Sequence, residues 1–179
     1  GNGEAVAVLL AAPNIGIVIG GTCAGWIAGR IGPQGPLLGG ILIGTVATFS
    51  MLAGVAVLPL AIACGAMLGM AAGAIGTSGY NLAIDLAVPE RQGTVAGLVS
   101  VSLALGSVAV NVAGGEVLKA TQVPGLFGDG APASTVTGVH LYVLMAGVLF
   151  ALAAVPTIAL MRTSSRTAED RATARAVGV

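Results

Sequence analysis

Long stretches without a charged residue constrain this chain more than any other feature of its sequence. They lie at 5–29, 31–84, 92–115 and 130–161, and the second is long enough for two membrane spans. A spanning helix needs about 20 mostly apolar residues, and backbone in lipid must satisfy its own hydrogen bonds. The pattern therefore predicts an all-α membrane protein with about five transmembrane helices.

The composition agrees with this prediction. Hydrophobic residues make up 56% of the 179 and charged residues only 8%, whereas soluble domains carry about 25% charged residues. The 29 glycines suit helices that pack closely in a membrane. The formal net charge is zero, so the expected partner is the lipid bilayer and not a nucleic acid.

Proline-containing breaks divide the apolar sequence into spans. The breaks are Gly32–Pro36, Leu58–Leu60 and Val88–Gly93, where Pro and Gly favour turns and helix starts. A longer segment, Leu118–Gly138, is expected to be a surface loop without a core of its own. The expected spans are 5–28, 37–57, 61–84, 94–117 and 140–161, within a transmembrane bundle at 1–162 that precedes a tail at 163–179.

Basic residues near the span ends predict the orientation, because Lys and Arg are enriched on the cytoplasmic side. Only Lys119 falls on the opposite side from the arginines. The bias predicts an integral plasma membrane protein with its N-terminus outside and an Arg-rich cytoplasmic tail at its C-terminus. The arginines on the expected cytoplasmic side are Arg30, Arg91, Arg162, Arg166, Arg171 and Arg175.

Small residues recur at every fourth position in two spans, as Gly21, Gly25 and Gly29 and as Gly65, Gly69 and Gly73. This spacing places each set on one helix face. Such faces serve plain helix packing or allow helices to rock during alternating access, and both interpretations stay open.

The two cysteines lie inside apolar runs, so Cys23 and Cys64 are expected to be small buried hydrophobes. Neither a disulfide, a metal site nor a cofactor is predicted from them. Uncharged polar residues within spans, such as Asn14 and Thr22, are expected to form interhelical hydrogen bonds.

Two loops carry motif-like sequences. Residues 25–32 read GWIAGRIG, and residues 89–98 read PERQGTVAGL. The first is similar to the G-x-L-A-D-R-x-G-R loop motif of the major facilitator superfamily, and the second resembles the P-E-x-x-G-x-x-x-G-L stretch that enters its penultimate helix. The residues that carry the resemblance are Gly25, Arg30, Gly32, Pro89, Arg91 and Gly93.

The resemblance implies helices 8 to 12 of a 12-helix transporter, and is closest to the 14-helix drug/proton antiporter branch. It implies the C-terminal part of a secondary active transporter for proton-coupled efflux of a small-molecule substrate, with a missing N-terminal half as partner. The chain also begins at Gly1 instead of Met, as a fragment or processed piece does. Gly29 stands where the motif has Asp, so the motif's charge pair is not carried over to this loop.

Three polar residues within spans are the transport candidates: Asp85, Asn81 and Asn111. An ionisable residue inside a membrane is a functional candidate by default. For Asp85 the alternatives are proton coupling and an interfacial ion pair with Arg91 or Arg30. Asn81 and Asn111 are candidates for lining a substrate path, because polar groups in spans usually face the bundle.

Two other classes of function have some support in the sequence. Ser78, in the sequence Gly76–Gly79, and His140 weakly resemble the Ser/His pair of an intramembrane rhomboid protease. Their expected depths place them near opposite membrane faces, beyond the hydrogen-bond reach that a nucleophile and its base need, so an enzyme is not predicted. The third class is a non-transporting membrane assembly subunit.

Overall fold

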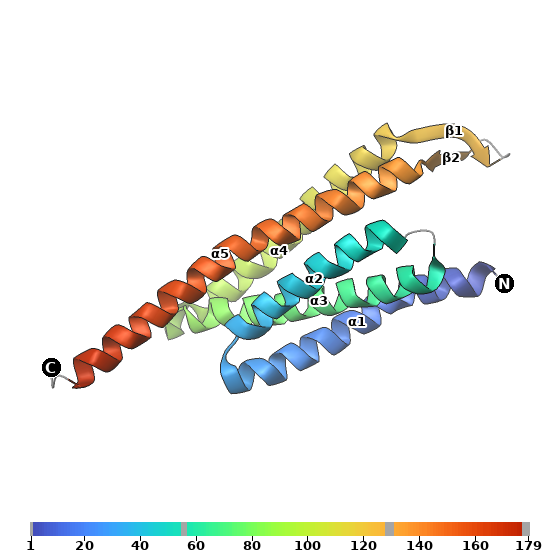
Figure 1. Cartoon of the computed structure of the whole chain (residues 1–179). Helices are drawn as coiled ribbons and strands as arrows, with labels where there is room; N and C mark the ends of the chain where they lie inside the picture. Colours follow the sequence, from blue (N-terminus) through green and yellow to red (C-terminus); the bar gives the residue numbers. More distant parts are fainter. Residues whose placement is uncertain (1, 55–56, 128–130, 177–179) are drawn as a thin grey trace.

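The computed structural model describes residues 2–54, 57–127 and 131–176 of the chain. Almost all of them are helical, and a short strand pair precedes the last helix (Figure 1). In chain order the elements are α1 (Asn2–Ile31), α2 (Gln34–Gly54), α3 (Leu58–Asp85), η1 (Pro89–Arg91), α4 (Gln92–Ala120), β1 (Gln122–Phe127), β2 (Ala131–Ser134) and α5 (Val136–Ala176).

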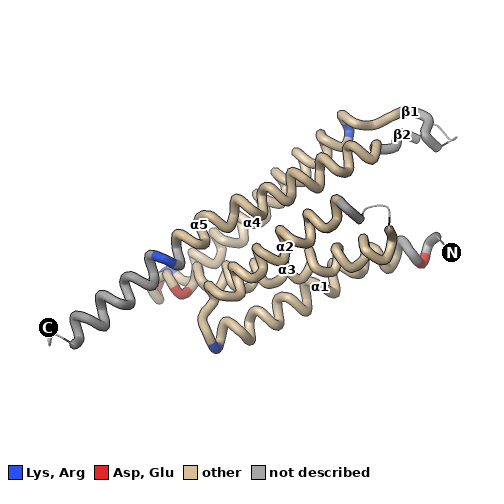
Figure 2. Tube along the Cα trace, viewed as in Figure 1, with Lys and Arg blue, Asp and Glu red and all other residues tan. Residues whose placement is uncertain are grey.

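Five helices in the described residues are long and apolar enough to cross a membrane. The expected all-α membrane fold with five spans is therefore confirmed. Charged residues gather toward the two ends of the bundle, and the middle carries none (Figure 2). The end with Arg30, Asp85 and Arg91 is called the Arg30 end below, and the end with β1 and β2 is called the hairpin end.

Prolines mark the helix starts that the sequence indicated. Pro59 occupies the first turn of α3, and Pro89 opens η1 ahead of α4. A proline fits there because the first turn of a helix has no internal acceptor for its missing N–H. The observed α2 begins and ends three residues before the expected span, since Gln34 already belongs to its first turn.

Four helices form a row in the order α1, α3, α2 and α5, with α3 between α1 and α2 (Figure 1). The most extensive contact joins α1 to α3, although α2 separates them in sequence, and α1 and α2 touch sparingly. The buried side chains are small: Thr48, Cys64 and Ser78 are the largest that are fully enclosed among the described residues. The large apolar side chains mostly point outward, as a lipid-facing surface requires.

Glycines bring the backbones of α1 and α3 into direct contact. A Cβ added at Gly16 or Gly20 would overlap the carbonyl oxygen of Ala66 or Met70, respectively. In the reverse direction, a Cβ at Gly69 would overlap the carbonyl oxygen of Pro13. The two parallel helices therefore approach as closely as small-residue faces permit.

Aromatic residues fill the antiparallel contact between α2 and α5. The ring of Phe150 lies where a Cβ of Gly44 would project, and Phe49 lies against Gly147. Nearer the hairpin end, the Nε2–H of His140 donates a hydrogen bond to the carbonyl oxygen of Leu52 at 3.2 Å. That carbonyl belongs to the last turn of α2, where helical donors run out.

The segment expected to be a surface loop without a core of its own contains a short strand pair. β1 and β2 are antiparallel, with Gln122 opposite Ser134 and Val123 opposite Ala133. The extended backbone satisfies its hydrogen bonds across the pair, so no apolar core is needed for it to form. At the other end of the chain, the tail continues α5 as helix up to Ala176.

Two local expectations were wrong. Cys64 is buried as expected, but Cys23 is exposed on α1. The side chains of Asn14 and Thr22 do not bridge helices, because they donate to the carbonyl oxygens of Leu10 and Val18 in their own helix. A polar side chain in a helix always has such an acceptor one turn back, and using it requires no neighbour.

Candidate functional site

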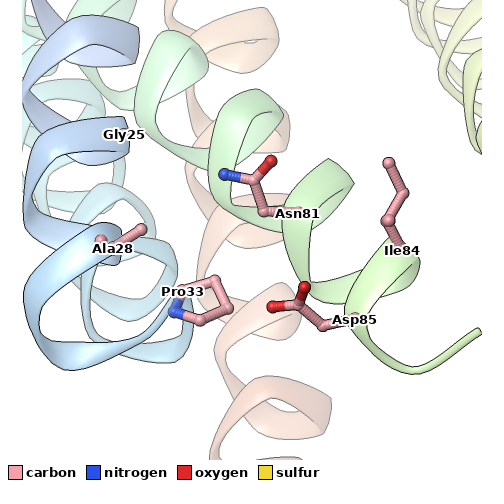
Figure 3. A pocket seen from close by; sticks show the side chains of 7 residues that line it. Gly25, Ala28, Pro33, Asn81, Ile84 and Asp85 are labelled. Carbon is pink, nitrogen blue, oxygen red and sulfur yellow. The ribbon is translucent and has the colours of Figure 1, made fainter.

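A polar pocket opens between α1 and α3 at the Arg30 end of the bundle (Figure 3). Its cavity volume is about 270 Å³. Figure 3 shows the amide of Asn81 and the carboxylate of Asp85 directed from α3 toward Ala28 and Pro33. The lining residues are Gly25, Ala28, Gly29, Pro33, Asn81, Ile84 and Asp85.

The pocket forms where the close contact between α1 and α3 ends, toward the Arg30 end of the bundle. A Cβ at Gly21 would still lie 3.1 Å from Thr77 Oγ1, and one at Gly25 would lie 3.7 Å from Thr77 Cγ2. At Gly29 no atom lies within 4 Å of such a Cβ. The distance between the helices thus grows along the glycine stripe, and the space that opens is the pocket.

Gly32 ends α1 below the pocket. Its φ is +87°, a conformation that L side chains rarely adopt. Its N–H donates to the carbonyl oxygen of Ala28 at 2.9 Å, which ends the helix in the manner of a glycine C-cap. The chain then turns at once into α2, and Pro33 becomes part of the pocket wall. The motif glycine therefore has a backbone role at this turn.

Asn81 and Asp85 are brought together, as residues four apart on one helix face are. Asn81 is half-buried and Asp85 is exposed. Within the described residues, neither Arg30 nor Arg91 lies within ion-pair distance of Asp85, and its carboxylate accepts no hydrogen bond. The expected interfacial ion pair is therefore not formed in this structure.

Arg30 has a different partner. Its guanidinium stacks over the ring of Trp26, with Cζ 3.8 Å from the ring centroid. This cation–π contact joins residues four apart on α1, and neither residue lines the pocket. Among the described residues, the carboxylate of Asp85 therefore has no arginine as an ion-pair partner.

The second motif forms the connection from α3 to α4. Pro89 begins η1, and the N–H of Arg91 donates to the carbonyl oxygen of Val88 at 2.9 Å. Gly93 lies in the first turn of α4 and is exposed. None of these residues lines the pocket, whereas Gly25, Ala28 and Gly29 of the first motif do.

Asn111 lies far from the pocket, on a helix with almost no buried surface. α4 contacts α3 and α5 sparingly, and only Gly114, against the Tyr142 ring, is buried among its residues. Small and polar residues follow one another at intervals of four and three, which places them on one face. This set, called the α4 stripe below, comprises Gly93, Gly97, Ser100, Ala104, Ser107 and Asn111, all of them exposed.

Among the described residues, the polar side chains of the α4 stripe form hydrogen bonds only within α4. The Asn111 amide donates to Ser107 Oγ at 3.4 Å, and Ser100 Oγ donates to the Ala96 carbonyl oxygen at 3.0 Å. The carbonyl oxygen of the Asn111 amide accepts no hydrogen bond from the described residues. Exposing polar side chains of a spanning helix to lipid costs free energy.

Ser78 and His140 do not form a pair. Ser78 is fully buried in α3, and its Oγ has no hydrogen-bond partner among the described residues. The His140 ring is engaged with Leu52 at the hairpin end. Ser78 belongs instead to the face that carries Asn81 and Asp85, since these residues are spaced by three and four.

Sequence reasoning missed part of the site and of its support. Gly16 and Gly20 form the tightest α1 contacts, whereas the glycine stripe predicted from the sequence begins at Gly21. The small-residue spacing at 16 and 20, four apart, would have found them. The 4-3-4-3-4 spacing of the α4 stripe could also have been recognised in the sequence. No sequence pattern indicates that Ala28, Pro33 and Ile84 line the pocket.

No protein-family model, curated protein or solved structure matches this chain. The functional argument therefore rests on the pocket between α1 and α3, on the uncovered α4 stripe and on the two loop motifs. All three belong to a membrane-embedded helical protein.

Proposed function

We propose that the chain is the C-terminal part of a secondary active transporter of the major facilitator type. In this proposal the transporter lies in the plasma membrane with the C-terminus of the chain in the cytoplasm, and it exports small molecules in exchange for protons. The observation that carries the proposal is the uncovered α4 stripe.

The argument starts from the cost of polar groups in hydrocarbon. Ser100, Ser107 and Asn111 lie within a span of α4 and are exposed. Such groups are stable in a membrane where they face protein or a water-filled path. A second helical bundle opposite α4 provides both, because transporters of this kind place the substrate path between two halves.

Two further observations support the proposal. The loops at 25–32 and 89–98 resemble those of the superfamily, and both lie at the same end of the bundle. The carboxylate of Asp85 lies at that end too. An ionisable residue inside a membrane span is a functional candidate by default.

The test is transport by the complete reading frame in inverted membrane vesicles under an imposed proton gradient. Asn111→Leu should lower gradient-driven dye uptake at least ten-fold at an unchanged protein level. The control Val112→Leu alters a neighbouring side chain that lies off the α4 stripe and is exposed, so it should leave uptake unchanged.

Two outcomes would overturn the proposal. Equal uptake by both variants would mean that the α4 stripe does not line the path. Absence of gradient-driven flux from the complete protein, for every compound in a panel of cationic and neutral dyes, would favour a membrane assembly subunit, in which another subunit covers the same stripe.

A further inference from the structure

We propose that the pocket between α1 and α3 binds a monovalent inorganic cation of the size of Na⁺, with the Asp85 carboxylate and the Asn81 amide oxygen as ligands. The site does not depend on the proposed transport. It is inferred from charge, cavity volume and the oxygen atoms that the pocket presents.

The electrostatics of the pocket favour a positive ion. Both α1 and α3 end beside it, and a helix C-terminus carries roughly half a negative charge. Asp85 adds a full negative charge in the last turn of α3. Arg30 is the nearest arginine in sequence to the α1 wall, and its guanidinium lies on Trp26. The field of two helix ends and one carboxylate is thus unopposed by any lining residue.

The pocket also presents backbone oxygen. Gly25 and Gly29 have no side chains, so the pocket wall there is backbone. The carbonyl oxygen of Gly25 lies inside the helical ladder of α1, whereas that of Gly29 lies in the last turn, where Pro33, four residues later, has no N–H to donate to it. Helix C-terminal ends and exposed carbonyls coordinate Na⁺ at comparable membrane sites. Asp85 presents its carboxylate from the opposite wall. The Asn81 amide turns its nitrogen toward α1 in Figure 3, and a half-turn about χ2 brings its oxygen into the same place.

The charge and the volume select the class of ion. One carboxylate balances one positive charge, whereas Ca²⁺ and Mg²⁺ sites usually contain more acidic ligands. No group of three His, Cys, Asp or Glu side chains suited to a metal occurs in the described residues. A cavity of about 270 Å³ has room for an ion with several of its waters, at about 30 Å³ per water.

The test measures thiol reactivity at the pocket, so it requires no transport. Cys23 and Cys64 are first replaced by Ala, and Gly29→Cys is introduced, where the added Cβ meets no atom within 4 Å. A cationic trimethylammonium methanethiosulfonate and its anionic sulfonate analogue are applied to the purified chain in nanodiscs. N-methylglucamine replaces Na⁺ at constant ionic strength. The control is Gly93→Cys, at a glycine of the same end that has the same free space.

We expect the cationic reagent to be favoured about five-fold at Gly29→Cys relative to Gly93→Cys, the effect of one nearby charge. Na⁺ should slow the reaction at Gly29→Cys in a saturable manner and leave Gly93→Cys unaffected. Adding Asp85→Asn should abolish both effects. Adding Glu90→Gln, which removes an acidic group at the same end but outside the pocket, should abolish neither.

Three results would overturn the proposal. One is no saturable effect of Na⁺ at Gly29→Cys. Another is equal protection by Na⁺ with and without Asp85→Asn. The third is protection by Ca²⁺ at far lower concentrations than by Na⁺, which would indicate a divalent site. If Asp85→Asn does not fold, Asn81→Leu serves instead, because it fills the pocket without removing the carboxylate and must also abolish protection.

Discussion

Replacing Gly69 by Ala should break the contact on which the α1–α3 pair depends. The added Cβ would overlap the Pro13 carbonyl oxygen and would lie 2.8 Å from the Pro13 carbonyl carbon. An ordinary contact begins at 3.4 Å, and the carbonyl oxygen is nearer than the carbonyl carbon, so α1 and α3 must separate by roughly 1 Å or more. A gap of about 1 Å forfeits up to about half of each dispersion contact along the pair.

The expected loss in unfolding free energy is about 2–3 kcal/mol, the upper range for overpacking, because the obstacle is backbone that cannot change rotamer. Gly76→Ala is the matched control on the same helix, since no atom lies within 4 Å of its Cβ. That variant should be neutral or should gain up to about 1 kcal/mol from helix propensity. Steric-trap unfolding of the purified chain in bicelles measures both.

The reasoning would be refuted by equal unfolding free energies for Gly69→Ala and Gly76→Ala. Combining Gly69→Ala with Gly73→Ala supplies a second check. Gly73 meets the Ile17 carbonyl oxygen on the same helix pair, so once the helices have separated the second change should cost less than it does alone. Strict additivity would mean that each glycine acts locally and that the helices do not move apart.

Three shorter predictions concern other parts of the chain. Ser134→Cys in a background free of native cysteines should react with a membrane-impermeant maleimide from outside intact cells, and reaction only after permeabilisation would reverse the topology. His140→Ala should lower the unfolding free energy by about 1 kcal/mol through the lost hydrogen bond to Leu52, whereas His140→Gln should retain part of it, and equal losses would exclude that bond as the cause. Gly32→Ala should cost about 1–2 kcal/mol because its φ is +87°, and an unchanged unfolding curve would show that the turn relaxes freely.

The lengths of the stretches without charged residues made the number of membrane spans predictable. Five spans follow from the hydrocarbon thickness, and the turns at Gly32 and Pro59 follow from local backbone preferences. Neither the span lengths nor the turn preferences predict which helices contact one another, because any apolar helix face is also stable against lipid. The pairing of α1 with α3 became visible only where Gly16 and Gly69 meet backbone oxygens.

The candidate site was predictable in part for a similar reason. Asn81 and Asp85 were identifiable as polar residues four apart near a span end. Their pocket also needs Pro33 and the divergence of α1 from α3 beyond Gly25, which depend on tertiary geometry. Asn14 and Thr22 were expected to form hydrogen bonds to neighbouring helices. Their side chains instead donate to carbonyl oxygens of their own helix.

The pairing of α1 with α3 has a consequence for biosynthesis. During translation α1 enters the membrane before α2, with which it makes little contact, and before α3. Its glycine face meets its partner only after α3 has been inserted as well, about 30 residues after the end of α2. The order in which the helices are made thus differs from the order in which they assemble, and a nascent chain halted after α2 would present the unpaired face of α1 to lipids, insertases and quality-control proteases.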